Sequence, residues 1–538
     1  MSCNSIPYGD NETATLLAQN RAYFDRAANA AQYASRSGQA EQAMLWARLA
    51  AECAWRMHPG FYTHPPLEAM LRTLGEKLTG TTAVDVPVLP ARKGTAKTWL
   101  HLITTAYMIG GHTRLVERLI VNARAINEDQ HTILLIDQGK NPFPAWLSDA
   151  AESSGGALIK LPVELSLVDR ACIVRRIALD WADTVLLHVH PEDPVASVAF
   201  ALPGGPPVIY VNHADHLFWL GAGCSDIVAD IRPEGHDVTT TRRGNIQSMI
   251  VPIPLELPES SISVANARRS LGIPPNMVVL VAIASSYKFA PYGQLDFPSA
   301  AVTILQKHTD TILIVVGPTS SDPLWQNALE LTSGRIRLLG IQSNIEQYYA
   351  VADIFLESFP LGSLTSTFDA MLRGVPVIRA PHGAPPLFTI SAYDGLGDNS
   401  CNIQEYLLRV SALITDPLLR KETGLTQREA VTAVHTGSGW LDAWQQLIVN
   451  LPASHTIRPD IKESNWDSLS DIDFIWAEFS ERQSVHKPDK ALFFKKRIRT
   501  IRRKTSRGLL LYRVLRAVAE CNWTGAGILL RNIKQLTT

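Results

Sequence analysis

The sequence predicts an α/β protein with two consecutive domains, each built on a doubly wound parallel sheet, and with helical segments at both ends. From about residue 97 to residue 450, short apolar runs alternate with amphipathic helical stretches. This alternation is typical of parallel strands covered by helices on both faces of the sheet. Two prolines in Val251–Leu255 indicate a stiff hinge, because proline fixes φ and has no amide donor. We therefore expect a helical accessory domain (1–95), an N-terminal α/β domain (96–254), a C-terminal α/β domain (255–455) and a basic helical tail (456–538).

Ten apolar runs have the length and composition of buried strands, five on each side of the hinge. No G-x-G-x-x-G follows the first of them, which argues against a dinucleotide-dependent enzyme. The runs are Trp99–Thr105, Thr132–Ile136, Ala157–Leu161, Thr184–Val189, Pro207–Asn212, Val278–Ile283, Thr311–Gly317, Arg335–Gly340, Asp353–Glu357 and Val375–Arg379.

The N-terminal region is predicted to be helical. Alanines recur at i, i+3 and i+4 through residues 12–57, which predicts two closely packed helices, and a third is expected around Leu67–Leu74. Two roles stay open for this part of the chain. It could pack against the body of the protein, or it could bind an acceptor or a partner.

The composition describes a well-cored globular protein, with 46% hydrophobic and 19% charged residues. Its six cysteines form no C-x-x-C pair, which argues against a disulfide framework or a zinc site and fits a reducing compartment. No basic and then apolar leader opens the chain, and no apolar run reaches the ~18 residues of a spanning helix. We therefore expect a cytoplasmic protein, free or at the inner face of a membrane.

A strongly basic segment lies near the C-terminus. Residues 490–516 contain eleven Lys or Arg and no acid, so the rest of the chain has a net charge of −12. The segment could be a solvated helix that covers the body. It could also make a peripheral membrane contact, since each basic residue near an anionic surface contributes about 1 kcal/mol. We expect no nucleic-acid partner, because the only aromatic residues among the charges of 490–504 are Phe493 and Phe494.

Several histidines follow predicted strands of the first α/β domain. Gly110-Gly111-His112, His190 and His213 all come just after such a run. Because ligands bind beyond the carboxyl ends of parallel strands, these residues could converge on one crevice. Histidine has a pKa near ~6.5 and suits a general base, although each ring could equally be satisfied by backbone groups. The spacing around Asp215 is a weak metal pattern, and we expect no metal.

The stretch Glu357–Ile378 has the pattern of a strand end, a loop of small residues, a short helix, a glycine turn and a new strand. Thr365, Ser366 and Thr367 place hydroxyls and N–H groups at the helix start, where the macrodipole favours a phosphate. Asp369, in the same turn, could accept hydrogen bonds from a ribose diol. The alternative is an ordinary βα loop with a capped helix.

In this order, the residues of 97–450 resemble glycosyltransferases of the GT-B type. The resemblance rests on Leu271-Gly-Ile-Pro, Ser286-Tyr-Lys288, Val316-Gly317 and the Glu357–Ile378 stretch. This last stretch is similar to the acidic donor motif of retaining enzymes. It is also similar to the Thr-Thr…Asp segment of the O-GlcNAc transferase and of the bacterial protein N-glucosyltransferases. The resemblance implies two facing domains with a nucleotide-sugar in the cleft between them.

The resemblance also implies roles for individual residues. Lys288 would neutralise the diphosphate, the helix start at Thr365–Thr367 would bind the β-phosphate, and Asp369 would bind the ribose. The glycine loop at Gly110 and Gly111 would face the sugar and the phosphates. His112 and His213 are the candidates for a catalytic base.

The chain departs from the family pattern at three positions. Retaining enzymes usually have Glu where Asp369 stands, and Glu357 lies twelve residues before Asp369 rather than the usual eight. Leu364 replaces a histidine of the O-GlcNAc group, which removes one phosphate contact. Glu357 is therefore not carried over as catalytic.

The resemblance implies a metal-independent glycosyltransferase, of the hexosyltransferase class, with a UDP-sugar as donor and no other cofactor. The helical domain favours a protein acceptor, and a glycan or lipid-linked acceptor stays open. Two alternatives share the architecture. One is a degenerate GT-B protein that only binds a partner, and the other is a sugar-nucleotide epimerase.

Overall fold

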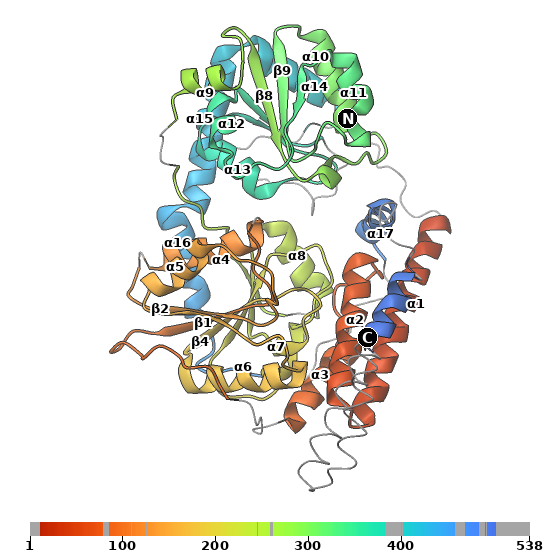
Figure 1. Ribbon diagram of the computed structural model, residues 1–538, viewed down its shortest axis with the longest axis vertical. Coiled ribbons are helices and arrows are strands. Elements are labelled where there is room, and N and C mark those ends of the chain that lie inside the picture. Colours follow the sequence, from red (N-terminus) through yellow and green to blue (C-terminus); the bar gives the residue numbers. More distant parts are fainter. Residues whose placement is uncertain are drawn as a thin grey trace, which may run out of the picture.

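The computed structural model describes residues 11–78, 85–108, 110–124, 126–244, 246–258, 262–381, 400, 402–457, 469–483, 490 and 492–501. Over these residues the chain forms two α/β domains with parallel sheets, and a group of helices stands along one side of the first domain (Figure 1). The predicted fold class is confirmed.

The N-terminal α/β domain has a seven-stranded sheet in the order β3-β2-β1-β4-β5-β6-β7, and all of its pairs are parallel. Five of these strands match the predicted runs, whereas β6 and β7 were not predicted. The sheet consists of β1 (Thr98–Ile103), β2 (Gln130–Leu135), β3 (Leu158–Lys160), β4 (Thr184–His188), β5 (Val208–Asn212), β6 (Ile227–Asp230) and β7 (Ser248–Ile250). Its helices are α4 (Gly111–Ala123), α5 (Ala145–Ser153), α6 (Leu167–Trp181), α7 (Val195–Ala199) and α8 (Pro233–Arg242).

The C-terminal α/β domain has a five-stranded parallel sheet in the order β10-β9-β8-β11-β12. Because β8 and β11 are neighbours, the loops that follow them lie side by side at the carboxyl edge. The strands are β8 (Val278–Ile283), β9 (Thr311–Val316), β10 (Ile336–Leu338), β11 (Ile354–Leu356) and β12 (Val377–Ile378). The helices are α9 (Val264–Ser270), α10 (Phe297–Lys307), α11 (Gln326–Thr332), α12 (Glu346–Val351), α13 (Leu364–Leu372), α14 (Ile403–Thr415) and α15 (Pro417–His435).

The two domains are joined at the predicted hinge. The Nδ1 atom of His435, the last residue of α15, lies 2.8 Å from the Ile253 carbonyl, and the Leu255 amide donates to the His435 carbonyl. The next helix, α16 (Gly437–Val449), crosses back to the N-terminal domain (Figure 1). There the ring of Trp444 packs 5.6 Å from that of Trp99 on β1. The hinge and α16 therefore connect the domains on one side of the cleft.

The helices beside the N-terminal domain begin with α1 (Asn11–Arg36), α2 (Ala40–Arg56) and α3 (Pro65–Lys77). The predicted alanine stripes are largely buried between α1 and α2. Helix α3 crosses α7 so closely that a Cβ on Gly75 would lie 2.2 Å from the Val198 carbonyl oxygen. Nearby, the buried Glu68 carboxylate accepts hydrogen bonds from the amides of Gly221 and Gly223, and burial raises its pKa to about 7. This part of the chain is thus built onto the α/β body.

Two later segments join this helical group. Helix α17 (Asp471–Gln483) packs along α1, and helical residues 492–501 bury Phe494 and Ile501 in the core that α1 and α2 form. Lys495, Lys496 and Arg499 stay exposed. A solvated helix covering the body accounts for this part of the basic segment. Membrane contact stays a prediction, and residues 502–516 lie outside the described residues. None of the described helices is both long enough and apolar enough to cross a bilayer.

Candidate functional site

The carboxyl ends of the two sheets face each other across the interdomain cleft. The first residue of α4, Gly111, lies opposite Thr365 in the first turn of α13, and a Cβ on Gly111 would be 3.4 Å from the Thr365 hydroxyl. Gly110, at the N-cap of α4, has a φ of 141°, which an L side chain rarely adopts. Two helix N-termini from different domains therefore meet at this point.

The hydroxyls of Thr365, Ser366 and Thr367, at the start of α13, have different surroundings. Ser366 donates to the Ile283 carbonyl at 2.8 Å, and Thr367 donates back to the Ser363 carbonyl at 3.0 Å. These two hydroxyls are therefore occupied within their own domain. The Thr365 hydroxyl instead faces Gly111 across the cleft. The amides of residues 364–366 have no acceptor within the helix, as is usual for a first turn.

Lys288 lies beside this turn. It belongs to a short 3₁₀ helix, Ser286–Phe289, and its ammonium donates to the Gly362 carbonyl at 2.7 Å. Burial lowers the pKa of Lys288 to about 8, although the Glu357 carboxylate opposes this shift. An ammonium has three donors, so Lys288 can hold the loop before α13 and still bind an anion.

Asp369 lies one turn further along α13 and takes part in an ion pair between the domains. Its Oδ1 atom is 3.4 Å from Nη2 of Arg118 on α4, and both side chains are mostly buried. Burial raises the pKa of Asp369, and the charge of Arg118 opposes that shift. The sequence analysis missed Arg118. Its position seven residues after Gly111 was the available signal, because two helical turns return a side chain to the same face.

The structure brings together the three strand-end histidines. The ring of His112 is 4.2 Å from that of His213 and 5.9 Å from that of His190. The Nε2 atom of His112 donates to the His188 carbonyl at 2.8 Å, which leaves Nδ1 of the neutral ring with a lone pair. Burial lowers the pKa of His112 to about 4 and holds that of His213 well below its ordinary value. Both rings are therefore uncharged at neutral pH.

An aromatic residue that the sequence analysis missed extends this cluster. Tyr107 is 45% exposed, and its ring stacks on His190 with centroids 5.7 Å apart. The Tyr107 hydroxyl lies 3.4 Å from Nε2 of His190. The position of Tyr107 directly before the glycine loop was a usable signal, because that loop faces the cleft.

A row of buried histidines lies beneath the cluster. Nε2 of His101 is 3.0 Å from Nδ1 of His131, and Nδ1 of His101 is 3.1 Å from Nε2 of His188. Burial lowers the pKa of His131 and of His188 to about 3, so the row is neutral. The function of this row is structural, because it fixes His188, and the His188 carbonyl accepts the hydrogen bond from His112.

The weak metal pattern around Asp215 has other partners in the structure. The Asp215 carboxylate is hydrogen-bonded by Arg232 at 2.9 Å and lies 3.1 Å from Nδ1 of His216. Among the described residues, no three His, Cys, Asp or Glu side chains are grouped so that they could hold a metal ion.

The ion pair between Arg118 and Asp369 is expected to hold the domains together. Arg118→Ala removes this contact, which should cost on the order of 1 kcal/mol and increase the radius of gyration of the ligand-free protein in small-angle X-ray scattering. Arg114→Ala is the matched control. Arg114 lies on the same helix, but its guanidinium stays within its own domain, 3.2 Å from Glu117 and 4.1 Å from the Trp146 ring centroid. Identical scattering from both variants would contradict the role of Arg118.

Comparison with known proteins identifies the fold. No protein-family model matches the sequence. The structure is similar to a glycosyltransferase from Rickettsia africae, with 14% identity, a TM-score of 0.50, and coverage of 66% of this chain and 98% of that one. HepE from Anabaena, solved with UDP and glucose, has 15% identity, a TM-score of 0.48 and coverage of 65% and 98%. An O-GlcNAc transferase variant from Thermobaculum terrenum has 13% identity, a TM-score of 0.45 and coverage of 86% and 85%.

At such low identity the comparison establishes the architecture. The order of strands in the two sheets, the facing carboxyl edges and the similarity to the Rickettsia enzyme agree. The chain has the two-domain fold of the GT-B glycosyltransferases.

Proposed function

We propose that the protein is a glycosyltransferase of the hexosyltransferase class, which takes its sugar from a UDP-sugar and needs no metal. One observation carries the proposal. Lys288, the first turn of α13 and Asp369 lie together in the cleft, opposite the glycine loop of the other domain. These are the groups that a nucleoside diphosphate requires, namely a cation and free amides for the phosphates and a carboxylate for the ribose.

The proposed chemistry uses these groups on the leaving diphosphate. As the acceptor atom forms a bond to the anomeric carbon of the sugar, the bond from that carbon to the diphosphate oxygen breaks. Its electron pair leaves with the diphosphate, and negative charge develops there. Lys288 and the amides at the start of α13 are fixed before the reaction, so they stabilise this charge without reorganising. The Thr365 hydroxyl adds a donor from the same turn.

Asp369 is proposed to accept hydrogen bonds from the ribose diol. In the ligand-free protein its carboxylate is paired with Arg118. A bound ribose would take the place of Arg118 on one oxygen of the Asp369 carboxylate. Nucleotide binding would therefore break the contact between Arg118 and Asp369 and form one between the ribose and Asp369.

His112 is the proposed base, with His213 as the second candidate. The Nδ1 lone pair of His112 can accept the proton of an acceptor group, because Nε2 is already held by the His188 carbonyl. A negative charge on the acceptor or on a bound diphosphate would raise the pKa of the His112 imidazole toward neutrality.

A protein acceptor is proposed on the basis of the helices beside the cleft. Helix α17 lies at the level of the space between the domains, and α1–α3 stand along one side of the N-terminal domain (Figure 1). This additional helical surface favours a protein acceptor in the proposal.

A nucleotide screen tests the proposal. The melting temperature of the full-length protein is measured with UDP-, GDP-, ADP- and CMP-sugars, and a UDP-sugar is expected to give the largest shift. At a ligand concentration of about 100 times Kd, the stabilisation should be about 2.7 kcal/mol, and Lys288→Ala should lose most of it. If no nucleotide stabilises the wild type, the transferase proposal fails. If Lys288→Ala keeps the full shift, only the phosphate assignment fails.

Affinity for UDP should depend on pH through Lys288. Because burial lowers the pKa of Lys288 to about 8, the free side chain loses its positive charge as the pH rises through this value. The affinity, measured by calorimetry, should therefore fall between pH 7 and pH 9, by at most about tenfold per pH unit. Lys288→Arg keeps its charge over this range and should lose less. Parallel curves for the two proteins would show that Lys288 does not bind the diphosphate.

The assignment of the base has its own test. His112→Asn should lower sugar transfer by about 10²–10⁴-fold while the thermal shift with the nucleotide is retained. His190→Asn is the comparison, since it changes a neighbouring imidazole of the same cluster. If His190→Asn loses sugar transfer and His112→Asn retains it, the base is His190 and not His112.

A further inference from the structure

We propose that α17 is a positioning element for Lys288, so that a helix from the C-terminal part of the chain sets the affinity of the nucleotide site. This inference rests on the proposed function of Lys288. It concerns a segment, residues 471–483, that lies outside both α/β domains in the sequence.

Helix α17 meets the C-terminal domain at Tyr292 and in a shared apolar cluster. The Tyr292 hydroxyl donates to Oε2 of Glu478 at 2.9 Å, and the Tyr292 ring packs edge-on against Phe479 with centroids 6.3 Å apart. Leu361 is buried in the same apolar cluster, together with Trp476. One contact is therefore polar and directional, and the other is a buried apolar contact.

Tyr292 and Leu361 belong to the two loops that the Lys288 ammonium connects. Tyr292 lies four residues after Lys288, and Leu361 directly precedes Gly362, whose carbonyl accepts the hydrogen bond from Lys288. The Leu361 amide also donates to the Lys288 carbonyl at 3.4 Å. The ammonium thus bridges two loops, and each loop has a residue in the apolar cluster that α17 enters. A shift of either loop would move the charge away from the phosphate position.

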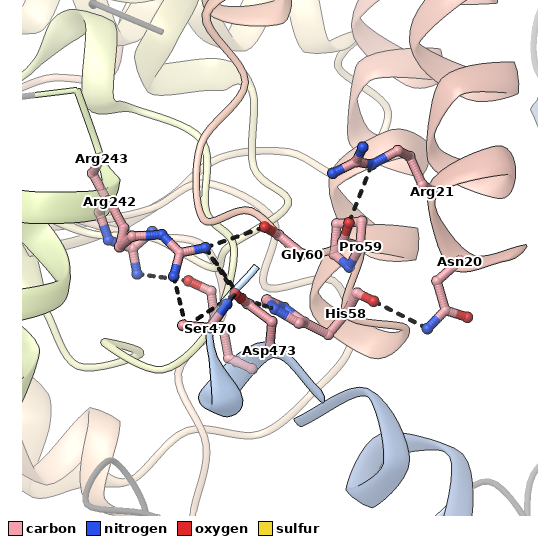
Figure 2. A network of polar contacts seen from close by, with 10 residues as sticks. Asn20, Arg21, His58, Pro59, Gly60, Arg242, Arg243, Ser470 and Asp473 are labelled. Atoms are coloured by element: carbon pink, nitrogen blue, oxygen red, sulfur yellow. Dashed lines mark hydrogen bonds and ion pairs between the residues drawn. The ribbon is translucent and has the colours of Figure 1, made fainter. Parts of the chain in front are cut away.

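The beginning of α17 is anchored to the rest of the molecule by a buried carboxylate (Figure 2). Asp473 is fully buried, with Oδ1 2.8 Å from Nε2 of His58 and Oδ2 3.0 Å from Nη2 of Arg242. The Ser470 amide also donates to this carboxylate at 2.8 Å. Burial opposes the charge, but the hydrogen bond from His58 and the charge of Arg242 hold the pKa of Asp473 below its ordinary value.

The same network includes the segment between α2 and α3. Arg242 donates to the Gly60 carbonyl at 3.2 Å, and the His58 carbonyl accepts from Asn20 of α1 at 3.0 Å. The helical group and α8 of the N-terminal domain therefore hold one end of α17, while its other contacts support the Lys288 loops. A mechanical connection of this kind would act on nucleotide binding through the position of Lys288. A helix that merely covered the protein would influence stability alone.

A double-mutant cycle in the full-length protein separates these two roles. UDP affinity is measured by calorimetry for the wild type, Tyr292→Phe, Lys288→Ala and the double variant. Tyr292→Phe keeps the ring and removes the hydroxyl that donates to Glu478. It should weaken UDP binding about fivefold in the wild-type background and less than about twofold in the Lys288→Ala background, because the pair is coupled.

Two further readouts sharpen the test. Uridine has no phosphate, so Tyr292→Phe should leave its affinity unchanged, and Glu478→Gln, which keeps an acceptor oxygen, should bind UDP like the wild type. Ser411→Ala is the control, since it removes a hydrogen bond to His308 in the same domain, away from α17. Ser411→Ala should change neither the affinity for UDP nor the affinity for uridine.

The possible failures can be told apart. If the wild type binds no UDP, the proposed function fails. If the wild type binds UDP and Tyr292→Phe weakens binding equally in both backgrounds, or weakens uridine binding as much, the positioning role alone is overturned. Hydrogen exchange gives a check that needs no nucleotide. Amide exchange of residues 286–292 should increase in Tyr292→Phe, and unchanged exchange would contradict the inference.

Discussion

The buried carboxylate of Asp473 is the constraint on which the assembly of the domains depends. A charge that is removed from water is tolerated only when it is paired and hydrogen-bonded. His58 of the helical group and Arg242 of the N-terminal α/β domain together meet this requirement. Three parts of the chain must therefore come together before the Asp473 carboxylate has all of its partners. Loss of one partner would leave an uncompensated charge in the interior, which is far more costly than the loss of a surface ion pair.

Because Asp473 anchors the beginning of α17, it fixes the position of this helix beside the space between the two α/β domains. The hinge and α16 join the α/β domains on one side, and α17 lies at the other side (Figure 1). Between them, the carboxyl ends of two parallel sheets face each other. Neighbouring strands β1, β4 and β5 place the three histidines at one edge, while neighbouring strands β8 and β11 place Lys288 beside the first turn of α13. The topology thus separates the proposed acceptor chemistry from the proposed phosphate chemistry and directs both into the same space.

Much of this arrangement could be predicted from local sequence pattern. Apolar runs between amphipathic stretches predict buried parallel strands, and ten of the twelve strands in the described sheets were found in this way. Strands β6 and β7 were missed because polar residues such as Asp230 and Ser248 interrupt their apolar runs. Gly111, Lys288, Thr365 and Asp369 could be selected as candidates because their surroundings in the sequence resemble a phosphate-binding loop.

The remaining features depend on contacts between distant residues. Arg118 and Asp369 are 251 positions apart, and His58 and Asp473 are 415 positions apart. No local pattern specifies such pairs. The internal hydrogen bonds of Ser366 and Thr367 could not be predicted either, since a helix-start hydroxyl can bind a ligand or its own backbone equally well. Sequence pattern therefore identifies the residues of the candidate site, whereas the tertiary structure decides which of their atoms are free to act.

The row of His131, His101 and His188 has a consequence for the behaviour of the protein in acid. Burial keeps the pKa of each imidazole far below the ordinary 6.5, and to about 3 for His131 and His188. The unfolded chain therefore binds more protons than the native protein between about pH 3 and pH 6.5, and the free energy of unfolding decreases as the pH falls through this range. Most carboxylates protonate only near pH ~4. Imidazoles in the middle of a β-sheet would thus contribute to the onset of acid denaturation, in a mildly acidic medium where most surface carboxylates are still charged.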